Sequence, residues 1–523
     1  MNRKTLRQAT IMMALMCGTA GAQEITVGTR TSPAVDPHFL WLSTNTAYNR
    51  HVFETLIDKN ADNKLTPQLA LSWTPISDDV WEFKLRPGVK FQDGSALTAE
   101  DVVASEKRVR TLPNNPGPYT YTVQSIKSDE VVDPLTIRFH TDGPKPYLPG
   151  EITHFFIVPK AVAETASTAD FRSGKAAIGT GPFRFQEYQP DSRYVVVRND
   201  GYWGEKPVWN KVTFRIIPQD APRVAALLSG DVNVIEYLPP ADVATMRSKP
   251  QITVASKPTP RFLYLKFDVE PGPRNDVTDK NGTPLPKNPL ADERVRHAIS
   301  LGIDRKSIAE RVMSGFAVPA EELVPQGFNG YDPGIKLTPY DVPQAKRLLA
   351  EAGYPDGFGL TIACSNDRYV NDGQICQAIA QSLARIGMAM KVEAVPSSVF
   401  FGRIKAPSPQ YSFFMAGWGS SMTGEADALW TFARTYDPQK STGTQNAGGY
   451  SNPTLDAIID QARATLDREK RGALLQQAMR MTTEDAAVLP LHYQSIILAA
   501  SKGFVVEART DEETRAMNMR PAQ

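Results

Sequence analysis

Residues 54–103 constrain the fold more than any other part of this 523-residue chain, because they combine bulky apolar side chains with closely spaced turns. The apolar residues are Trp73, Trp81, Phe83, Leu85, Val89 and Phe91. Within residues 81–85, apolar and charged side chains alternate, which predicts a strand with one buried face. Thr98 and Asp101 have the spacing of a capping box and predict the start of a helix. The segment therefore predicts a packed structural domain, and it presents no nucleophile, base or metal-ligand set.

The composition excludes some classes of partner. The chain has 58 basic and 57 acidic residues, so its formal net charge is +1, and no polybasic run is present. We therefore expect neither nucleic acid nor an anionic lipid surface as a partner. With 41% hydrophobic residues, the chain can build large cores, and its length predicts two or more domains.

The first 22 residues have the pattern of a cleavable signal peptide. An apolar stretch at residues 9–17 follows three basic residues, which are Arg3, Lys4 and Arg7. Ala20 and Ala22 then provide a small-x-small cleavage site. The apolar stretch is shorter than the ~20 residues that a membrane-spanning helix needs. We expect removal of residues 1–22 and a periplasmic location.

The cysteines leave two questions open. Cys17 offers the alternative of a lipid anchor, but cleavage after Ala22 would remove it, and we favour a free protein. Cys364 and Cys376 remain in the mature chain, and an exported protein can join such a pair in a disulfide. The alternative is two reduced, buried thiols. No His or further Cys lies at the spacing of a zinc site.

Catalytic motifs are missing from the sequence. None of the six histidines belongs to an HExxH motif, and no GxSxG elbow is present. We therefore expect that the protein is not an enzyme and has no metal or cofactor.

Residues 72–103 also resemble the signature stretch of a known family. The pattern SW…WxFxLRxGVKFxDG…LTAEDV is similar to that of the peptide/opine/nickel class (family 5) of extracytoplasmic solute-binding proteins, which serve ABC importers. Further matching motifs follow in order, among them Gly179-Thr180-Gly181-Pro182-Phe183, Asn199-Asp200-Gly201-Tyr202-Trp203, Gly417-Trp418 and Tyr450-Ser451-Asn452-Pro453. The resemblance extends along nearly the whole mature chain.

This resemblance implies an α/β periplasmic-binding-protein fold, in which two lobes close on a cleft and the first lobe carries an extra subdomain. The expected core of lobe I comprises residues 23–50, 178–268 and 490–523. The extra subdomain would comprise residues 51–177, and lobe II would comprise residues 269–489.

The implied function is capture of a small polar solute, either peptide-like or opine- and glutathione-like. The implied partners are this small-molecule ligand and the permease subunits of an ABC transporter, and we expect a monomer. The alternatives are a non-peptide ligand, such as a metal chelate, haem or a sugar conjugate, and a chaperone or sensor role on the same fold.

The first candidate site is the loop after a predicted strand at residues 411–416. Glycine lets a ligand approach the backbone closely, and tryptophan offers a flat apolar wall with one N–H donor. The candidate residues are Gly417, Trp418, Ser420, Ser421 and Glu425. Among relatives this loop lines the cleft. The alternative for Trp418 is a core position under a surface turn.

Ser421 is a departure from the family pattern. Peptide-binding relatives place an aspartate at this position to hold the peptide's amino terminus, and a serine hydroxyl cannot neutralise an ammonium group. Glu425 could instead offer a carboxylate to an amine, or it could stabilise the start of the following helix. We favour the helix-start role for Glu425.

The second candidate site is the loop at residues 364–372. Arg368 has donors suited to a carboxylate or a phosphate, and in relatives an arginine of this loop holds the ligand carboxylate. The alternative is a structural ion pair with Asp367, Asp372 or the other lobe. Asp372 has the position of a helix N-cap.

A third candidate site lies near the N-terminus of the mature chain. Trp41 and Asn45 belong to a loop that faces the cleft in relatives. The alternative is that these residues pack on the first helix.

Overall fold

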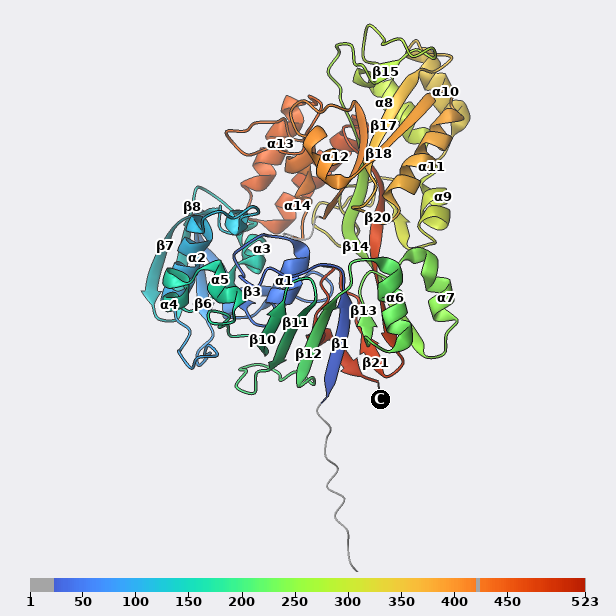
Figure 1. The fold of residues 1–523 in the computed structure, drawn as a ribbon. Coiled ribbons are helices and arrows are strands. Elements are labelled where there is room, and N and C mark those ends of the chain that lie inside the picture. Colours follow the sequence, from blue (N-terminus) through green and yellow to red (C-terminus); the bar gives the residue numbers. More distant parts are fainter. Residues whose placement is uncertain (1–22, 420–423, 523) are drawn as a thin grey trace, which may run out of the picture.

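Two lobes, one above the other, make up the protein (Figure 1). The structure is a computed structural model, and it describes residues 23–419 and 424–522. The predicted signal peptide, residues 1–22, therefore lies outside the described residues, as do Ser420 and Ser421. No helix of the described residues has both the length and the apolar character that a membrane crossing requires.

Lobe I is built on a sheet whose strands follow one another in the order β10, β11, β12, β1 and β13. These strands are β10 (Phe183–Gln189), β11 (Arg193–Arg198), β12 (Lys211–Ile216), β1 (Glu24–Thr29) and β13 (Val234–Ile235). β1 is parallel to both of its neighbours, β12 and β13. The helices of this lobe are α1 (Ser43–Asn49), α6 (Asp220–Ser229) and α7 (Val243–Arg247).

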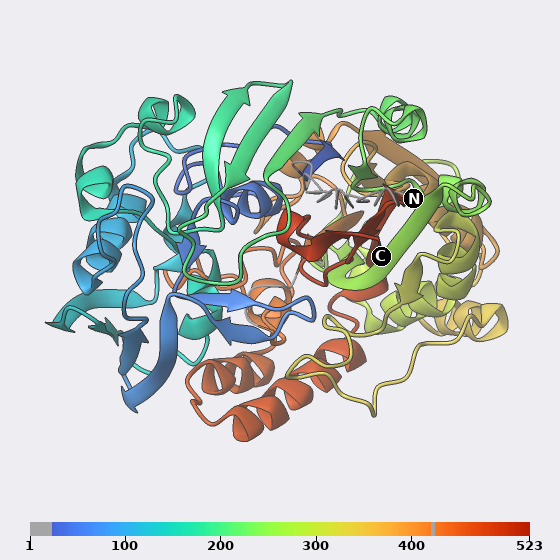
Figure 2. The ribbon, with the colours of Figure 1, turned by 90° about the horizontal axis from the view of Figure 1, so that it is seen from below.

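The extra subdomain lies to one side of this sheet (Figure 2). Its four strands, β5 (Ala70–Ser77), β6 (Val80–Leu85), β8 (Thr136–Thr141) and β7 (Ile126–Asp133), pair in that order, and its longest helix is α2 (Ala99–Thr111). Trp81, Phe83 and Leu85 are buried on one face of β6, which confirms the predicted strand. The predicted capping box is also confirmed, because Thr98 N–H donates to Asp101 Oδ2 at 2.8 Å.

Lobe II contains the strand–helix–strand unit that the sequence predicts. β17 (Gly359–Ser365) is parallel to β18 (Ala389–Val395), and α11 (Asp372–Ala384) connects them. β19 (Phe413–Gly419) lies on the other side of β17. The larger of the remaining helices are α8 (Glu293–Leu301), α10 (Val342–Glu351), α12 (Ser397–Arg403), α13 (Pro453–Arg463) and α14 (Arg468–Glu484).

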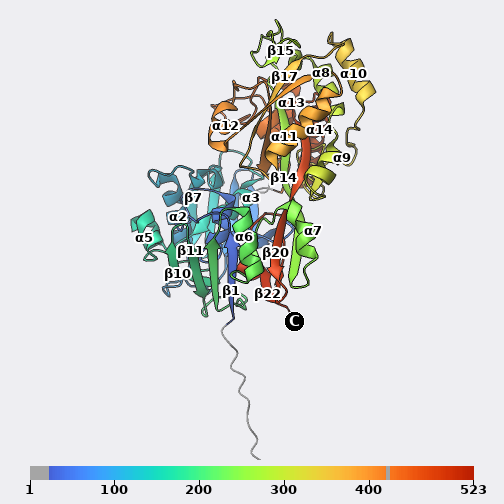
Figure 3. The same cartoon turned by 45° about the vertical axis from the view of Figure 1, so that its right-hand side comes forward.

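Two long antiparallel strands, β14 (Ile252–Phe267) and β20 (Leu489–Ser501), run from one lobe into the other (Figure 3). β20 pairs with β13 of lobe I, whereas β14 pairs with β19 of lobe II. The lobe limits predicted from the sequence fall between residues 268 and 269 and between residues 489 and 490, at the lobe II ends of these strands. The chain passes from one lobe to the other within the two strands themselves. Because both strands are continuous, they fix the position of one lobe relative to the other, but the strands can still bend between the lobes.

Candidate functional site

Two cavities lie where the lobes meet. The larger has a volume of 1060 Å³ and is lined by Tyr147 of the extra subdomain, Thr259 of β14, and Phe328 and Glu425 of lobe II, among others. The smaller has a volume of 390 Å³ and is lined by residues of both lobes, including Arg30 of lobe I and Tyr369 of lobe II. The smaller volume is within the range of about 300–1,000 Å³ that is typical of small-molecule sites, and the larger is slightly above it.

The end of β19 is fixed to the loop that carries Arg368. Tyr369 Oη donates to the carbonyl oxygen of Gly417 at 3.0 Å. Burial raises the pKa of Tyr369, so its hydroxyl keeps its proton and remains a donor. A side chain at position 417 would place its Cβ 2.7 Å from the Tyr369 ring, so only glycine allows this approach. The two loops predicted to form a site are therefore in direct contact.

Trp418, the next residue of β19, has a polar atom without a hydrogen-bond partner among the described residues. Its ring meets Phe432 edge-on, with the ring centroids 5.4 Å apart, and it is partly buried against the lobe II core. The Trp418 indole N–H is buried and has no hydrogen-bond partner among the described residues. A buried donor without a partner costs about 1–3 kcal/mol. Trp418 thus has the packing of the core alternative, and it is not among the residues that line either of the two cavities.

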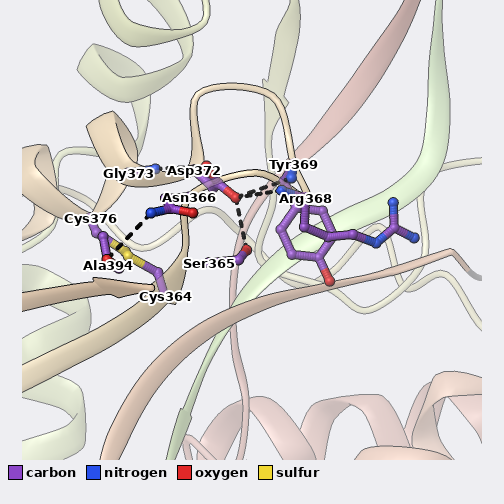
Figure 4. Close-up of a disulfide and its surroundings, with 9 residues drawn as sticks. All are labelled: Cys364, Ser365, Asn366, Arg368, Tyr369, Asp372, Gly373, Cys376 and Ala394. Carbon is purple, nitrogen blue, oxygen red and sulfur yellow. Dashed lines mark hydrogen bonds between the residues drawn. A yellow bond between two sulfur atoms is a disulfide. The ribbon is translucent and has the colours of Figure 1, made fainter. Parts of the chain in front are cut away.

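The loop of Arg368 is held from within by Asp372 (Figure 4). Asp372 Oδ2 accepts from the backbone N–H groups of Arg368, at 3.1 Å, and Tyr369, at 3.2 Å, and from Ser365 Oγ at 2.8 Å. The N-cap of α11 is Asn371, in a left-handed conformation, and Asp372 is the first helical residue. The prediction of Asp372 as the N-cap residue is therefore wrong, because Asn371 occupies that position. Asp372 binds its own loop through Oδ2 and accepts the N–H of Gly373, within α11, through Oδ1 at 3.0 Å.

The Arg368 side chain extends away from Asp372, past the ring of Tyr369 (Figure 4). Its Cζ lies 5.4 Å from the centroid of that ring. Asp367 accepts the backbone N–H of Ser397 at 2.8 Å and is not an ion-pair partner. Among the residues that the structure describes, no carboxylate forms an ion pair with Arg368.

Cys364, near the end of β17, and Cys376, on α11, are joined in a disulfide beside this loop (Figure 4). Both residues are fully buried, and their Cα atoms are 6.8 Å apart. The bond links the strand and the helix that flank the Arg368 loop, and such a link limits how far the two elements can move apart.

Glu425 has a different role from the one predicted. Its carboxylate accepts from Arg471 Nε at 2.7 Å and from Arg471 Nη2 at 2.5 Å, and both side chains are buried. The N-cap of the following helical turn, Leu429–Ala433, is Ala428, which has no side-chain cap. The helix-start prediction for Glu425 is therefore wrong, because the carboxylate faces a guanidinium on α14.

Asn45 and Trp41 are held by neighbouring parts of lobe I. Asn45 is buried, and its amide accepts from Ala34 N–H at 3.1 Å and donates to the Leu40 carbonyl at 2.6 Å. The Trp41 ring meets the Tyr121 ring edge-on at 4.7 Å. Asn45 therefore shapes the loop at residues 34–40, and Trp41 packs on the extra subdomain.

The sequence analysis missed the lobe I wall of the smaller cavity. Arg30 directly follows β1, and its Cζ lies 5.0 Å from the ring centroid of Tyr237, which follows β13. Both residues line the smaller cavity. Ligands of α/β sheets collect beyond the carboxyl ends of parallel strands, and that rule would have selected both positions.

Three of the described histidines are kept neutral by burial. Burial lowers the pKa of His38, His51 and His492 to about 4, so these rings are neutral near pH 7. No group of three or more possible metal ligands occurs within residues 23–419 and 424–522.

Comparison with known proteins agrees with this architecture. Residues 64–440, more than half of the chain, match the family described as "Bacterial extracellular solute-binding proteins, family 5 Middle". The glutathione-binding protein GsiB of Salmonella paratyphi A is 26% identical over 478 residues, which cover 90% of this chain and 88% of that protein. The dipeptide-binding protein of Escherichia coli K12 is 29% identical, with coverage of 86% and 85%.

A solved structure has the same fold. The periplasmic binding protein DppA of Helicobacter pylori, in complex with the peptide STSA, superposes with a TM-score of 0.76 at 24% identity, covering 96% of this chain and 99% of that one. The fold is thus that of a two-lobed periplasmic binding protein. The chain belongs to the bacterial extracellular solute-binding proteins of family 5.

Proposed function

We propose that the protein captures one small polar solute between its lobes and delivers it to the permease of an ABC importer. The observation that carries this proposal is that the Arg368 loop lines the smaller cavity opposite lobe I and is hydrogen-bonded, through Tyr369, to the end of β19 at Gly417. We further propose export by a cleavable signal at residues 1–22 and action as a monomer. Relatives that bind solutes for transport support the absence of catalysis.

The proposed ligand carries an anionic group. Arg368 would hold this group, because its guanidinium has no ion-pair partner among the described residues and presents several donors. Trp418 would offer its free N–H, and Gly417, Ser420 and Ser421 would border the solute. Because position 421 has no aspartate to bind an ammonium group, the solute does not need a free α-amine. This favours an opine- or glutathione-like solute over a plain peptide.

We expect bound solute to stabilise the protein without being converted. Mass spectrometry would identify a solute that co-purifies with the protein, because it distinguishes peptides, opines, metal chelates, haem and sugar conjugates by their masses. At a hundredfold excess over Kd, the identified solute should add ~2.7 kcal/mol to the free energy of unfolding. Thermal unfolding measures this gain, and chromatography of the recovered solute detects turnover. Steady conversion, or no stabilisation by any recovered solute, would contradict the proposal.

The replacement Arg368→Ala is expected to weaken binding of that solute by about tenfold to a hundredfold, because a charge-assisted hydrogen bond contributes ~1.5–3 kcal/mol. Titration calorimetry measures the loss. The control is Arg347→Ala, an exposed arginine on α10 of the same lobe, which should leave affinity unchanged. Equal affinity of the Arg368→Ala variant and the wild type would assign the loop a structural role. Tight binding of plain dipeptides that N-acetylation abolishes would contradict the interpretation of Ser421.

A further inference from the structure

The larger cavity, of 1060 Å³, lies where α3 (Leu148–Glu151) of the extra subdomain approaches α14 of lobe II (Figure 1). It shares no lining residue with the smaller cavity. Five aromatic rings belong to its wall, those of Trp73, Tyr147, Phe328, Tyr331 and Tyr493. Such a wall suits an occupant with an apolar body, because aromatic side chains offer large apolar areas for contact.

One carboxylate of this wall, that of Glu322, is buried without a cationic partner among the described residues. Glu322 is 4% exposed, and its Oε2 accepts the N–H of Asp332 at 2.8 Å. Its Oε1 accepts no hydrogen bond from any described residue, yet it is not among the polar atoms that the protein encloses completely. Because Glu322 lines the cavity, this free oxygen faces the open space.

The other acidic residues of the wall have cationic partners. Asp62 forms an ion pair with Lys257 at 2.5 Å. Glu321 lies 3.9 Å from a guanidinium nitrogen of Arg305. Glu425 is neutralised by the buried arginine of α14 described above. These three carboxylates therefore have partners within the protein, whereas Glu322 has none in the described part of the chain.

The cations of the wall do not compensate Glu322. They are Lys64, Arg468 and Arg471. Arg471 pairs with Glu425, and the other two are exposed, so that water screens their charges. Burial raises the pKa of Glu322 to about 7, and its negative charge is therefore costly unless a cation approaches it.

A second polar group of the wall also lacks a partner. Asn63 of the extra subdomain is 6% exposed, and neither atom of its amide forms a hydrogen bond with any residue that the structure describes. Buried amides are normally hydrogen-bonded, because an unsatisfied one is costly. A carboxylate and an amide without partners in one wall favour a polar group on whatever occupies the cavity.

We propose that the larger cavity is a second binding site, for a small organic amine whose ammonium group binds Glu322 and whose apolar part contacts the aromatic wall. An ammonium group donates charge-assisted hydrogen bonds to a carboxylate, and the faces of aromatic rings attract cations. Tyr493 Oη donates to the Glu322 carbonyl oxygen at 2.8 Å, and Tyr331 directly precedes Asp332, so two of the rings belong to the surroundings of Glu322. The inference goes beyond the proposed function, because this site uses neither the Arg368 loop nor the smaller cavity.

The test compares amines with alcohols of nearly the same size, which are uncharged. The pairs are benzylamine and benzyl alcohol, phenethylamine and phenethyl alcohol, and hexylamine and hexanol. Titration calorimetry at about pH 8 keeps Glu322 ionised, because this pH is above its pKa of about 7. The best-fitting amine should bind the wild-type protein at least about tenfold more tightly than its alcohol, as expected for one charge-assisted contact.

The decisive variant is Glu322→Gln, whose amide oxygen can still accept the N–H of Asp332. It should reduce amine affinity by about tenfold to a hundredfold and leave alcohol affinity nearly unchanged, so that the preference disappears. A second variant, Phe328→Ala, should weaken the amine and the alcohol alike, because it removes part of the apolar wall. The matched control is Asp129→Asn, because burial also raises the pKa of Asp129 to about 7, but Asp129 lies outside both cavity linings.

The inference is overturned if each amine binds no better than its alcohol, if no amine of the series binds, or if Glu322→Gln leaves the preference intact. Loss of amine binding in the Arg368→Ala variant, or displacement of the amine by the co-purified solute, would place the amine in the smaller cavity and would also overturn it. An amine that binds the Arg368→Ala variant as tightly as the wild type supports a separate second site.

Discussion

Replacing Arg515 with alanine is expected to lower the free energy of unfolding by about 3–5 kcal/mol, because Glu513 and Asp58 would lose one of their two guanidinium partners in a buried network. Arg515 is 5% exposed and contacts Glu513 Oε2 at 2.6 Å and Asp58 Oδ2 at 2.8 Å. Arg50 contacts the same two carboxylates, at 2.8 Å and 2.9 Å. The network attaches the C-terminal segment to the extra subdomain and to the residue that follows α1.

The protonation of Asp58 shows why this loss should be large. Burial alone would raise the pKa of Asp58, but the guanidinium groups of Arg515 and Arg50 outweigh burial and hold this pKa well below its usual range. Asp58 is therefore charged in the folded protein, and its charge depends on both arginines.

Urea denaturation of the Arg515→Ala variant measures the effect, and Arg193→Ala is the control. Arg193 pairs with Glu187 at 2.8 Å, but both side chains are about half exposed. An exposed pair contributes at most about 1 kcal/mol. If the two variants lost the same stability, the buried network would not have the role assigned to it.

Replacing Gly179 with alanine is expected to cost at least ~3 kcal/mol, the upper end of overpacking costs, because backbone atoms occupy the space that a methyl group needs. A Cβ at position 179 would lie 1.9 Å from the Val52 carbonyl oxygen. That oxygen accepts the N–H of Gly181 at 2.9 Å, and Gln92 N–H donates to the Gly179 carbonyl at 2.9 Å. The clash therefore falls on a hydrogen-bonded backbone junction that cannot move freely.

Thermal or urea unfolding measures this loss, and Gly402→Ala provides the matched control. Gly402 lies on α12, and a Cβ there would meet no atom within 4 Å. Alanine in this helix should be neutral or stabilising by up to about 1 kcal/mol. An unchanged stability of the Gly179→Ala variant would show that the junction can open without cost.

This junction also explains one of the motifs in the sequence. Gly179-Thr180-Gly181-Pro182-Phe183 supported the family resemblance, and both glycines contact the backbone of Val52. Phe183 N–H continues the contact by donating to the His51 carbonyl at 2.8 Å. The motif is therefore a packing requirement of lobe I, away from the cavities between the lobes.

The sequence by itself determined the features that depend on neighbouring residues. Alternation at residues 81–85 identified β6, the Thr98–Asp101 spacing identified the start of α2, and the pattern after residue 359 identified the parallel strands β17 and β18. Strand periodicity and helix capping act over a few residues, so these features are visible in a short window.

Only the tertiary structure decided which charged side chains form ion pairs or hydrogen bonds and which of them line a cavity. Glu425 is paired with Arg471, which is 46 residues away, and Asn371 instead of Asp372 is the N-cap residue of α11. Arg30 meets Tyr237 and shares a cavity with Tyr369 only because β1, β13 and β20 bring distant segments together. An ion pair depends on distance and burial, and no local pattern encodes the position of a residue hundreds of places away.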